Sequence, residues 1–225
     1  MEYRITGYQP EKLFHFFEEI SAIPRGSGNE KGISDYLVKF AEDRDLWVHQ
    51  DEANNVIIKK AASEGAKSQE PVMLQGHIDM VCEKRAGVEH DFEKDGLDLQ
   101  IKDGNLTANG TTLGADNGVA VALMLMIMDD EKINHPALEC VFTTEEEVGM
   151  EGAIALDTTD LKAKYLLNLD SEDEGHFLAG CAGGVKATAV LPMSCASAEG
   201  TAMTLRVHGL VGGHSGAEID KGRAN

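Results

Sequence analysis

The stretch VMLQGHID, residues 72–79, decides the fold class of this chain. It opens with a short apolar run typical of a buried strand, and that strand leads directly into His77. A second buried run at 138–142 is followed by two threonines and three glutamates, and a further strand predicted at 165–169 ends at Asp170. An apolar helical pattern begins at about residue 117, between the first two of these runs. Because strands alternate with helices, the sequence predicts an α/β layered sheet.

The residues before this stretch predict two helices and two strands. A first helix is expected over 10–20, where Pro10 occupies an early position. A Ser-x-x-Glu capping box at 27–30 predicts the start of a second helix. Alternating runs at 46–50 and 55–59 are typical of neighbouring strands.

The residues after the stretch predict a hairpin and a domain boundary. An Asp-Gly pair between two alternating runs indicates a hairpin over 99–108. Past a Gly-Gly pair the pattern changes, and 185–191 and 203–208 alternate like strands of a half-exposed sheet. We therefore expect one domain over 1–185 and the beginning of a second over 186–225.

The composition excludes several classes of protein. The 225 residues carry a net charge of −19, which argues against nucleic acid and anionic membrane surfaces as partners. The apolar fraction is 42%, enough for a buried core. Residues 1–7 contain no apolar signal core, and the longest apolar run, 119–128, is too short to span a bilayer. None of the four cysteines forms a close pair, and we expect a cytoplasmic protein.

Five side chains with metal-ligand or acid–base chemistry follow the predicted strands or begin the apolar helix. His77 follows one strand, Glu146 and Glu147 follow another, Asp170 follows a third, and Asp116 lies at the start of the helix. Ligands of open α/β sheets bind outside the carboxyl ends of the strands. If these strands are parallel neighbours, the five side chains converge on one crevice.

An imidazole with several carboxylates is a ligand set for zinc, manganese or cobalt. Carboxylates crowded into one crevice would repel one another without a cation, and one aspartate can bridge two metals. Asp79, two residues after His77, is placed to hold the other ring nitrogen. Each signal alone also has an ordinary structural explanation. The run Glu145–Glu147 suits a solvated turn or helix start, and Asp116 and Asp170 suit helix caps.

Several segments together resemble a known family. GHIDMV, residues 76–81, is similar to the first metal motif of the co-catalytic zinc aminoacylase/carboxypeptidase metallopeptidase superfamily. GTTLGADNG, residues 110–118, resembles its bridging-aspartate motif in the form typical of the Xaa-His (aminoacyl-histidine) dipeptidase branch. EEEVGMEGA, residues 145–153, resembles the catalytic-base motif, and GGHSG, residues 212–216, the histidine motif of the lid domain. Two further segments resemble the branch, 168–172 and 180–184.

The resemblance implies a set of metal ligands. His77 would bind one metal, and Asp170 would bind the same metal. Asp116 would bridge both metals, in the family through a cis peptide bond to the next residue, here Asn117. Glu147 would bind the second metal.

The resemblance also implies catalytic roles. Glu146 would be the general base, Asp79 would orient His77, and His214 of the lid domain would stabilise the oxyanion. Alignment on Val148 places the base at Glu146 and the ligand at residue 147, whereas a slip of one residue would move these roles to 145 and 146.

The fold and activity that the resemblance implies are those of a metallo-dipeptidase. We expect a three-layer αβα zinc-peptidase-like catalytic domain followed by the start of an α+β lid domain. Two divalent metal ions, Zn²⁺ with Mn²⁺ or Co²⁺ as alternatives, would supply a hydroxide that hydrolyses Xaa-His and other unblocked dipeptides. A homodimer would form through the lid domain in the full-length form.

Alternatives remain open at this point. The family's last metal ligand is a histidine far beyond residue 225, so the resemblance implies a truncated chain that lacks one ligand and is itself inactive. The shared ligand set also suits another peptidase or deacylase of the superfamily, such as a tripeptidase or carboxypeptidase. A third reading is an inactive remnant that binds metal or peptide.

Overall fold

The computed structural model describes residues 3–171, 175–180, 187–194, 196–197, 199–212 and 221–223. The chain divides into two compact units, Met1–His176 and Phe177–Asn225. The first unit contains every helix and strand of the described residues. No helix in this described part has the length and hydrophobicity that a membrane span requires.

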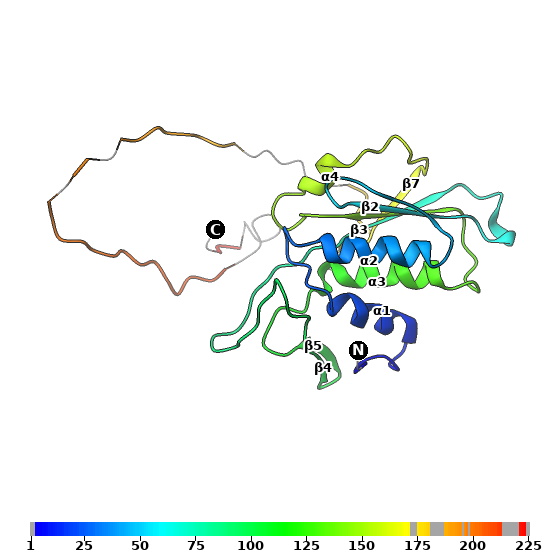
Figure 1. The fold of residues 1–225 in the computed structure, drawn as a ribbon, viewed down its shortest axis with the longest axis horizontal. Helices are drawn as coiled ribbons and strands as arrows, with labels where there is room; N and C mark the ends of the chain where they lie inside the picture. Colours follow the sequence, from blue (N-terminus) through cyan, green and yellow to red (C-terminus); the bar gives the residue numbers. More distant parts are fainter. Residues whose placement is uncertain are drawn as a thin grey trace. The chain divides into compact units, whose positions relative to one another are not determined.

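The first unit is a mixed sheet with helices. Its main sheet has the strand order β1-β2-β6-β3-β7. Strand β3 runs parallel to both β6 and β7, whereas β2 pairs antiparallel with both β1 and β6. The sheet lies above helices α1, α2 and α3 in the view of Figure 1. A separate hairpin pairs β4 with β5. In chain order the elements are α1 (Glu11–Ser21), α2 (Lys31–Glu42), β1 (Trp47–Gln50), β2 (Val56–Lys60), a 3₁₀ turn (Glu64–Ala66), β3 (Val72–His77), β4 (Leu99–Lys102), β5 (Asn105–Ala108), α3 (Ala115–Asp129), β6 (Leu138–Thr143), α4 (Glu151–Ala155) and β7 (Tyr165–Asn168).

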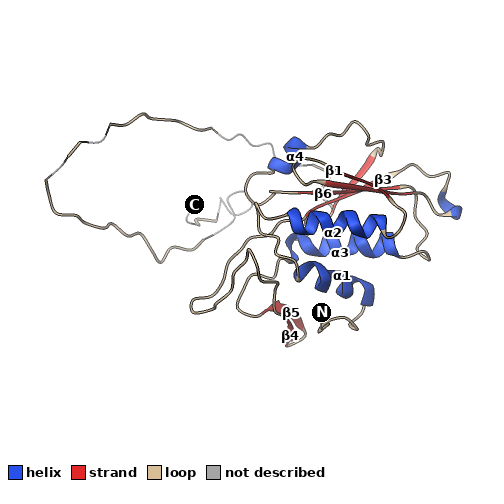
Figure 2. Cartoon of the chain, in the orientation of Figure 1, coloured by secondary structure: helices blue, strands red, loops and turns tan. Residues whose placement is uncertain are grey.

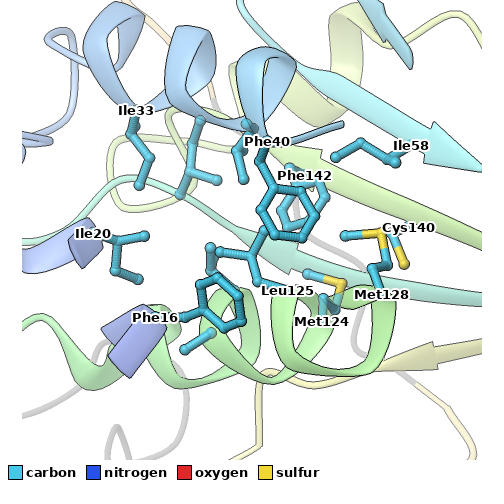
Figure 3. Close-up of a cluster of buried hydrophobic side chains, with 14 of the residues drawn as sticks. Phe16, Ile20, Ile33, Phe40, Ile58, Met124, Leu125, Met128, Cys140 and Phe142 are labelled. Atoms are coloured by element: carbon cyan, nitrogen blue, oxygen red, sulfur yellow. The ribbon is translucent and has the colours of Figure 1, made fainter. Parts of the chain in front are cut away.

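The main core lies between the sheet and helices α1, α2 and α3, which share one side of it (Figure 2). Alternate residues of the strands point into this core, among them Ile58 of β2 and Phe142 of β6, as the two-residue period of a strand requires (Figure 3). Helix α3 is apolar around most of its circumference and buries Met124 and Leu125 in the core. The position of α3 matters for the site, because its first turn lies beside the end of β3.

The opposite face of the sheet is covered more thinly. Ile57, Met73 and Val141 point to this side and pack against Leu156, Leu161 and Ala163. The covering layer consists of the short helix α4 and the segment after it (Figure 1). The α/β class predicted from the sequence is therefore confirmed, and within the described residues the third layer is slighter than a full layer of helices.

A close contact between β3 and α3 depends on Gly76. A methyl group at this position would overlap the side-chain oxygen of Asn117 and lie 3.0 Å from Cβ of Ala120. We expect Gly76→Ala to destabilise the fold by about 1–3 kcal/mol, because the strand and helix must separate to admit the methyl group. Urea denaturation would measure the loss.

A matched control for this substitution is Gly180→Ala. A methyl group at Gly180 meets nothing within 4 Å. Its effect is expected to stay within about 0.5 kcal/mol. Equal effects of the two substitutions would show that the close approach of α3 to β3 contributes nothing to stability.

One local prediction was wrong, that of the capping box at 27–30. Helix α2 begins at Lys31, and its N-cap residue Glu30 makes no side-chain capping bond. The Ser27 hydroxyl instead donates to the Asp79 carboxylate, with 2.8 Å between the oxygens. A hydrogen bond to a buried carboxylate is stronger than one to a neutral backbone group. The Ser27 side chain therefore bonds to Asp79 after the end of β3 and does not cap helix α2.

The second unit contains no strand within its described residues. Strands were expected at 185–191 and 203–208, but 187–191 and 203–208 have no partner strand, and Leu191 and Leu205 are exposed. An alternating pattern forms a strand only where a neighbouring strand completes the hydrogen-bond ladder. The predicted boundary near 185 and the start of a lid domain beyond it stay predictions, since residues 181–186 lie outside the described residues.

Candidate metal centre

Three parallel strands deliver the candidate ligands to one edge of the sheet. Strand β3 lies between β6 and β7, and His77, its last residue, is paired with Thr143, the last residue of β6. Strand β7 ends two residues earlier, where Asn168 pairs with Gln75. Residues 146 and 147 therefore follow β6, and Asp170 follows β7, all at the carboxyl end of the sheet. The parallel arrangement on which the predicted convergence depended is present.

Two overlapping groups of potential metal ligands share the His77 ring. The ring Nε2 lies 2.9 Å from Oδ1 of Asp116, 3.9 Å from Oε2 of Glu146 and 4.0 Å from Oδ2 of Asp170. Ligand atoms of His77, Asp116 and Asp170 all lie within 4.8 Å of one another, and the same is true of His77, Glu146 and Glu147. The donors of each group are thus spaced closely enough to hold a metal ion.

Asp116 reaches the ring because the start of α3 is not regular. Asp116 and Asn117 have non-helical backbone angles, and the peptide bond between them is cis, as the resemblance implied. The Asn117 amide donates to the Leu169 carbonyl at 3.0 Å and to Oδ1 of Asp170 at 3.2 Å. Asn117 therefore links the start of α3 to the end of β7. The resemblance implied its cis bond, whereas nothing in the sequence analysis predicted this second function of its side chain.

Asp79 is fully buried and accepts four hydrogen bonds. The donors are Nδ1 of His77 at 3.2 Å, the Ser27 hydroxyl, and the backbone N–H groups of Glu146 at 3.1 Å and Glu147 at 3.2 Å. Burial raises the pKa of Asp79, but these donors outweigh burial and lower it overall. As a carboxylate Asp79 only accepts, so Nδ1 of His77 carries the hydrogen and Nε2 faces the other carboxylates.

The three consecutive glutamates have different environments. Glu146 and Glu147 join the group around His77, whereas Glu145 belongs to neither group among the described residues. The backbone N–H of Glu145 donates instead to the buried Glu30 carboxylate at 3.2 Å. This arrangement favours the alignment that places the base at 146 and the ligand at 147. His214 lies outside the described residues, and its role stays a prediction.

Several carboxylates crowd around His77, and a bound cation would offset the repulsion between them. Burial lowers the pKa of His77, but its hydrogen bond to Asp79 and the nearby carboxylates raise it to about 9. Burial, together with the charges of Asp116 and Glu146, raises the pKa of Asp170 to about 6. Burial and the charge of Asp116 also raise the pKa of Glu147. One imidazole and several crowded carboxylates fit a divalent ion of the zinc, manganese or cobalt type.

The metal-free protein is expected to lose stability as the pH rises. The folded pKa of His77, about 9, lies above its ordinary value of 6.5, so the stabilisation is fully present below pH 6.5 and is lost through pH 9. A shift of this size corresponds to about 3 kcal/mol. Asp170 acts in the same direction, because a raised carboxyl pKa favours the protonated folded form and its cost grows between pH 3.8 and about 6.

Urea denaturation in the presence of a chelator, at several pH values between about 6 and 9, would measure this loss. The control variant is His77→Gln, which is expected to show a flatter dependence above pH 6.5. Identical slopes for the two proteins would contradict the prediction.

Comparison with known proteins identifies the family. The model of peptidase family M20/M25/M40 matches residues 73–219, the range that contains all the candidate ligands. The cytosol non-specific dipeptidase of Escherichia coli (strain K12) is 40% identical over 223 residues, which cover 98% of this chain and 46% of that protein. The chain belongs to peptidase family M20/M25/M40.

Solved structures of family M20/M25/M40 relatives resemble the chain in fold. The aminoacylhistidine dipeptidase from Vibrio alginolyticus has a TM-score of 0.74 and 41% identity, and the match covers 76% of this chain and 35% of that one. The aminopeptidase PepT from Bacillus cereus has a TM-score of 0.60 and 27% identity, with 72% of this chain and 44% of that one covered. The chain thus spans less than half the length of these relatives.

Proposed function

We propose that this chain carries the metal site and the general base of a metal-dependent dipeptidase. One observation carries the proposal: the side chains of His77, Asp116, Asp170, Glu146 and Glu147 meet at the carboxyl end of three parallel strands. Membership of a peptidase family, and the dipeptidase names of two relatives at 40% and 41% identity, support the substrate class.

The ligand roles are those that the family resemblance implies, and the spacing of the side chains supports the first of them. His77, Asp116 and Asp170 would hold one divalent ion. Asp116 also lines a cavity of about 280 Å³ together with Glu147, so these two carboxylates would hold a second ion, with Asp116 as the bridge. When bound, the ions would polarise the peptide carbonyl and acidify the attacking water. Zn²⁺ suits this mixture of nitrogen and oxygen donors, and Mn²⁺ and Co²⁺ are the alternatives.

The proton transfer is assigned to Glu146. Its carboxylate lies at the edge of the ligand group, 3.9 Å from Nε2 of His77. It would take a proton from the water as the oxygen bonds to the peptide carbon, and deliver that proton to the amine nitrogen as the carbon–nitrogen bond breaks. Asp79 would hold the His77 ring through Nδ1 and, through two backbone N–H groups, fix Glu146 and Glu147.

A panel of substrates tests the function. The purified chain would be freed of metal, reloaded with Zn²⁺, Mn²⁺ or Co²⁺, and incubated with Ala-His, carnosine, tripeptides and N-acylated amino acids. We expect metal-dependent release of amino acids from the dipeptides. Preferential cleavage of tripeptides or acylated amino acids would favour another peptidase or deacylase of the family. Metal binding without any hydrolysis would favour a non-catalytic remnant, and failure to bind metal would overturn the proposal.

Three further parts of the proposal concern the whole protein. A homodimer through the region of residues 186–225 is proposed, and size-exclusion chromatography with light scattering would test it. His214 would stabilise the oxyanion from the same region. A cytosolic location is proposed because the E. coli relative is named as a cytosol dipeptidase.

A further inference from the structure

Arg25, in the loop between α1 and α2, is buried directly behind the candidate metal centre. Its side chain heads the set of the largest fully buried side chains among the described residues, and its exposed fraction is 2%. Nη1 donates to the backbone carbonyls of Ile78 at 3.1 Å and Asp79 at 3.2 Å. Nη2 donates to the carbonyl of Gly114. One guanidinium therefore ties the residues that follow His77 to the loop that leads into Asp116.

The chain around Arg25 leaves space for this guanidinium. A methyl group on Gly114 would lie 2.6 Å from Nη2, and one on Gly118 would lie 2.7 Å from the same atom. These two glycines flank Asp116, the candidate bridging ligand. The loop that presents Asp116 therefore packs closely against the Arg25 side chain. This close packing supports the contact independently of the hydrogen bonds.

Arg25 is charged but does not form hydrogen bonds with the candidate ligand carboxylates. Burial lowers its pKa to about 10, while Asp79, Cys82 and Asp116 act against this, so the group stays charged at neutral pH. The guanidinium donates to the backbone carbonyls of Ile78, Asp79 and Gly114, and these hydrogen bonds do not occupy the carboxylate oxygens of Asp116. A cation close to the site lowers the repulsion between its carboxylates before any metal arrives.

We propose that Arg25 is a positioning residue that holds the Asp116 loop against the end of β3 and thereby keeps His77 and Asp116 at metal-binding distance. The inference rests on the proposed metal site. The loop that contains Arg25 makes two further contacts with the site. Ser27 donates to Asp79, and Glu30 accepts from the backbone N–H of Glu145. The segment from Arg25 to Glu30 acts as a brace behind the ligands.

The test compares Arg25→Met and Arg25→Lys with the control Arg44→Met in the full chain. Arg44 also donates from several nitrogens, to Asp129 and to the Phe40 carbonyl, but does so away from the metal centre. Zn²⁺ affinity would be measured by competition with a chromophoric chelator. The visible spectrum of the Co²⁺-loaded protein would report ligand geometry, and thermal unfolding in a chelator would report stability.

We expect Arg25→Met to weaken Zn²⁺ binding by about 10–100-fold and to change the Co²⁺ spectrum, as loss of a group that orients ligands commonly does. Arg25→Lys keeps the charge but loses the planar fork, and a loss of at least about tenfold is expected there too. Arg44→Met should lower the unfolding temperature and leave Zn²⁺ affinity unchanged.

The outcomes separate this inference from the proposed function. Zn²⁺ binding by wild-type protein together with wild-type affinity and spectrum in either Arg25 variant would overturn the positioning role alone. Absence of Zn²⁺ binding in the wild type would overturn the metal site itself. If Arg25→Met does not fold, Arg25→Lys decides the question.

Discussion

Glu146→Gln is expected to lower kcat for dipeptide hydrolysis by about 10²–10⁴-fold, the range typical of a lost general base. The amide has nearly the shape of the carboxylate but cannot take a proton from water. The backbone N–H of residue 146 would still donate to Asp79, so the turn after β6 should keep its shape. Metal content should therefore be unchanged. Steady-state kinetics on the metal-loaded protein, together with metal analysis by mass spectrometry, would measure both quantities.

The matched control is Glu145→Gln. Glu145 belongs to the same run of glutamates but stands outside both ligand groups of the described residues. Its replacement is expected to leave kcat close to that of the wild type. If Glu145→Gln abolishes hydrolysis and Glu146→Gln does not, the assignment of base and ligand is shifted by one residue along the run.

Asp116→Ala is expected to weaken the binding of both metal ions by more than about 100-fold, since loss of a ligand costs more than loss of a group that only orients one. Asp116 lies 2.9 Å from Nε2 of His77 and lines the cavity that it shares with Glu147. Asp170→Ala should weaken only the ion that His77 binds. Metal stoichiometry after dialysis against a weak chelator would distinguish the two variants.

A surface carboxylate supplies the control for this experiment. Asp35 is exposed on α2 and forms an ion pair with Lys31, far along the chain from the ligands. Asp35→Ala should therefore leave the stoichiometry unchanged. Retention of two ions by Asp116→Ala would show that its carboxylate does not bridge them.

The convergence of the ligands could be predicted because it depends on local patterns and one rule of sheet geometry. The runs at 72–75, 138–142 and 165–169 are short, largely apolar and followed closely by polar residues. Each became a strand, and the three are neighbours in the parallel part of the sheet. The hairpin over 99–108 was predictable for a similar reason, since an Asp-Gly turn acts within a few residues.

The brace behind the ligands could not be predicted in this way. Ser27 and Glu30 have the spacing of a capping box, and nothing within the local sequence tells a cap from a contact with residues 52 or 115 positions away. Arg25 donates to backbone carbonyls 53, 54 and 89 positions away. Every residue has such a carbonyl, so the sequence does not show which ones accept a hydrogen bond. Charged residues in loops are usually exposed, so the residue type of Arg25 also argued against a buried position.

The thin third layer and the absence of strands in the described part of 177–225 have a different cause. Alternation shows that a segment would suit a strand, but it does not show that a partner lies beside it. Leu205 and Val207 are exposed although their pattern is that of a half-buried strand. A pairing between distant segments is a property of the assembled fold and is not encoded in either segment alone.

The four hydrogen bonds to Asp79 have a consequence for when the complete site can form during folding. They come from residues 27, 77, 146 and 147, so all four donors are in place only after β3 and β6 have paired, and the paired residues of these strands lie 66 positions apart in the sequence. Distant pairings of this kind form slowly compared with local helices. The complete site is accordingly expected only late in folding, because the side chains that would hold the ion come together only once these strands have paired.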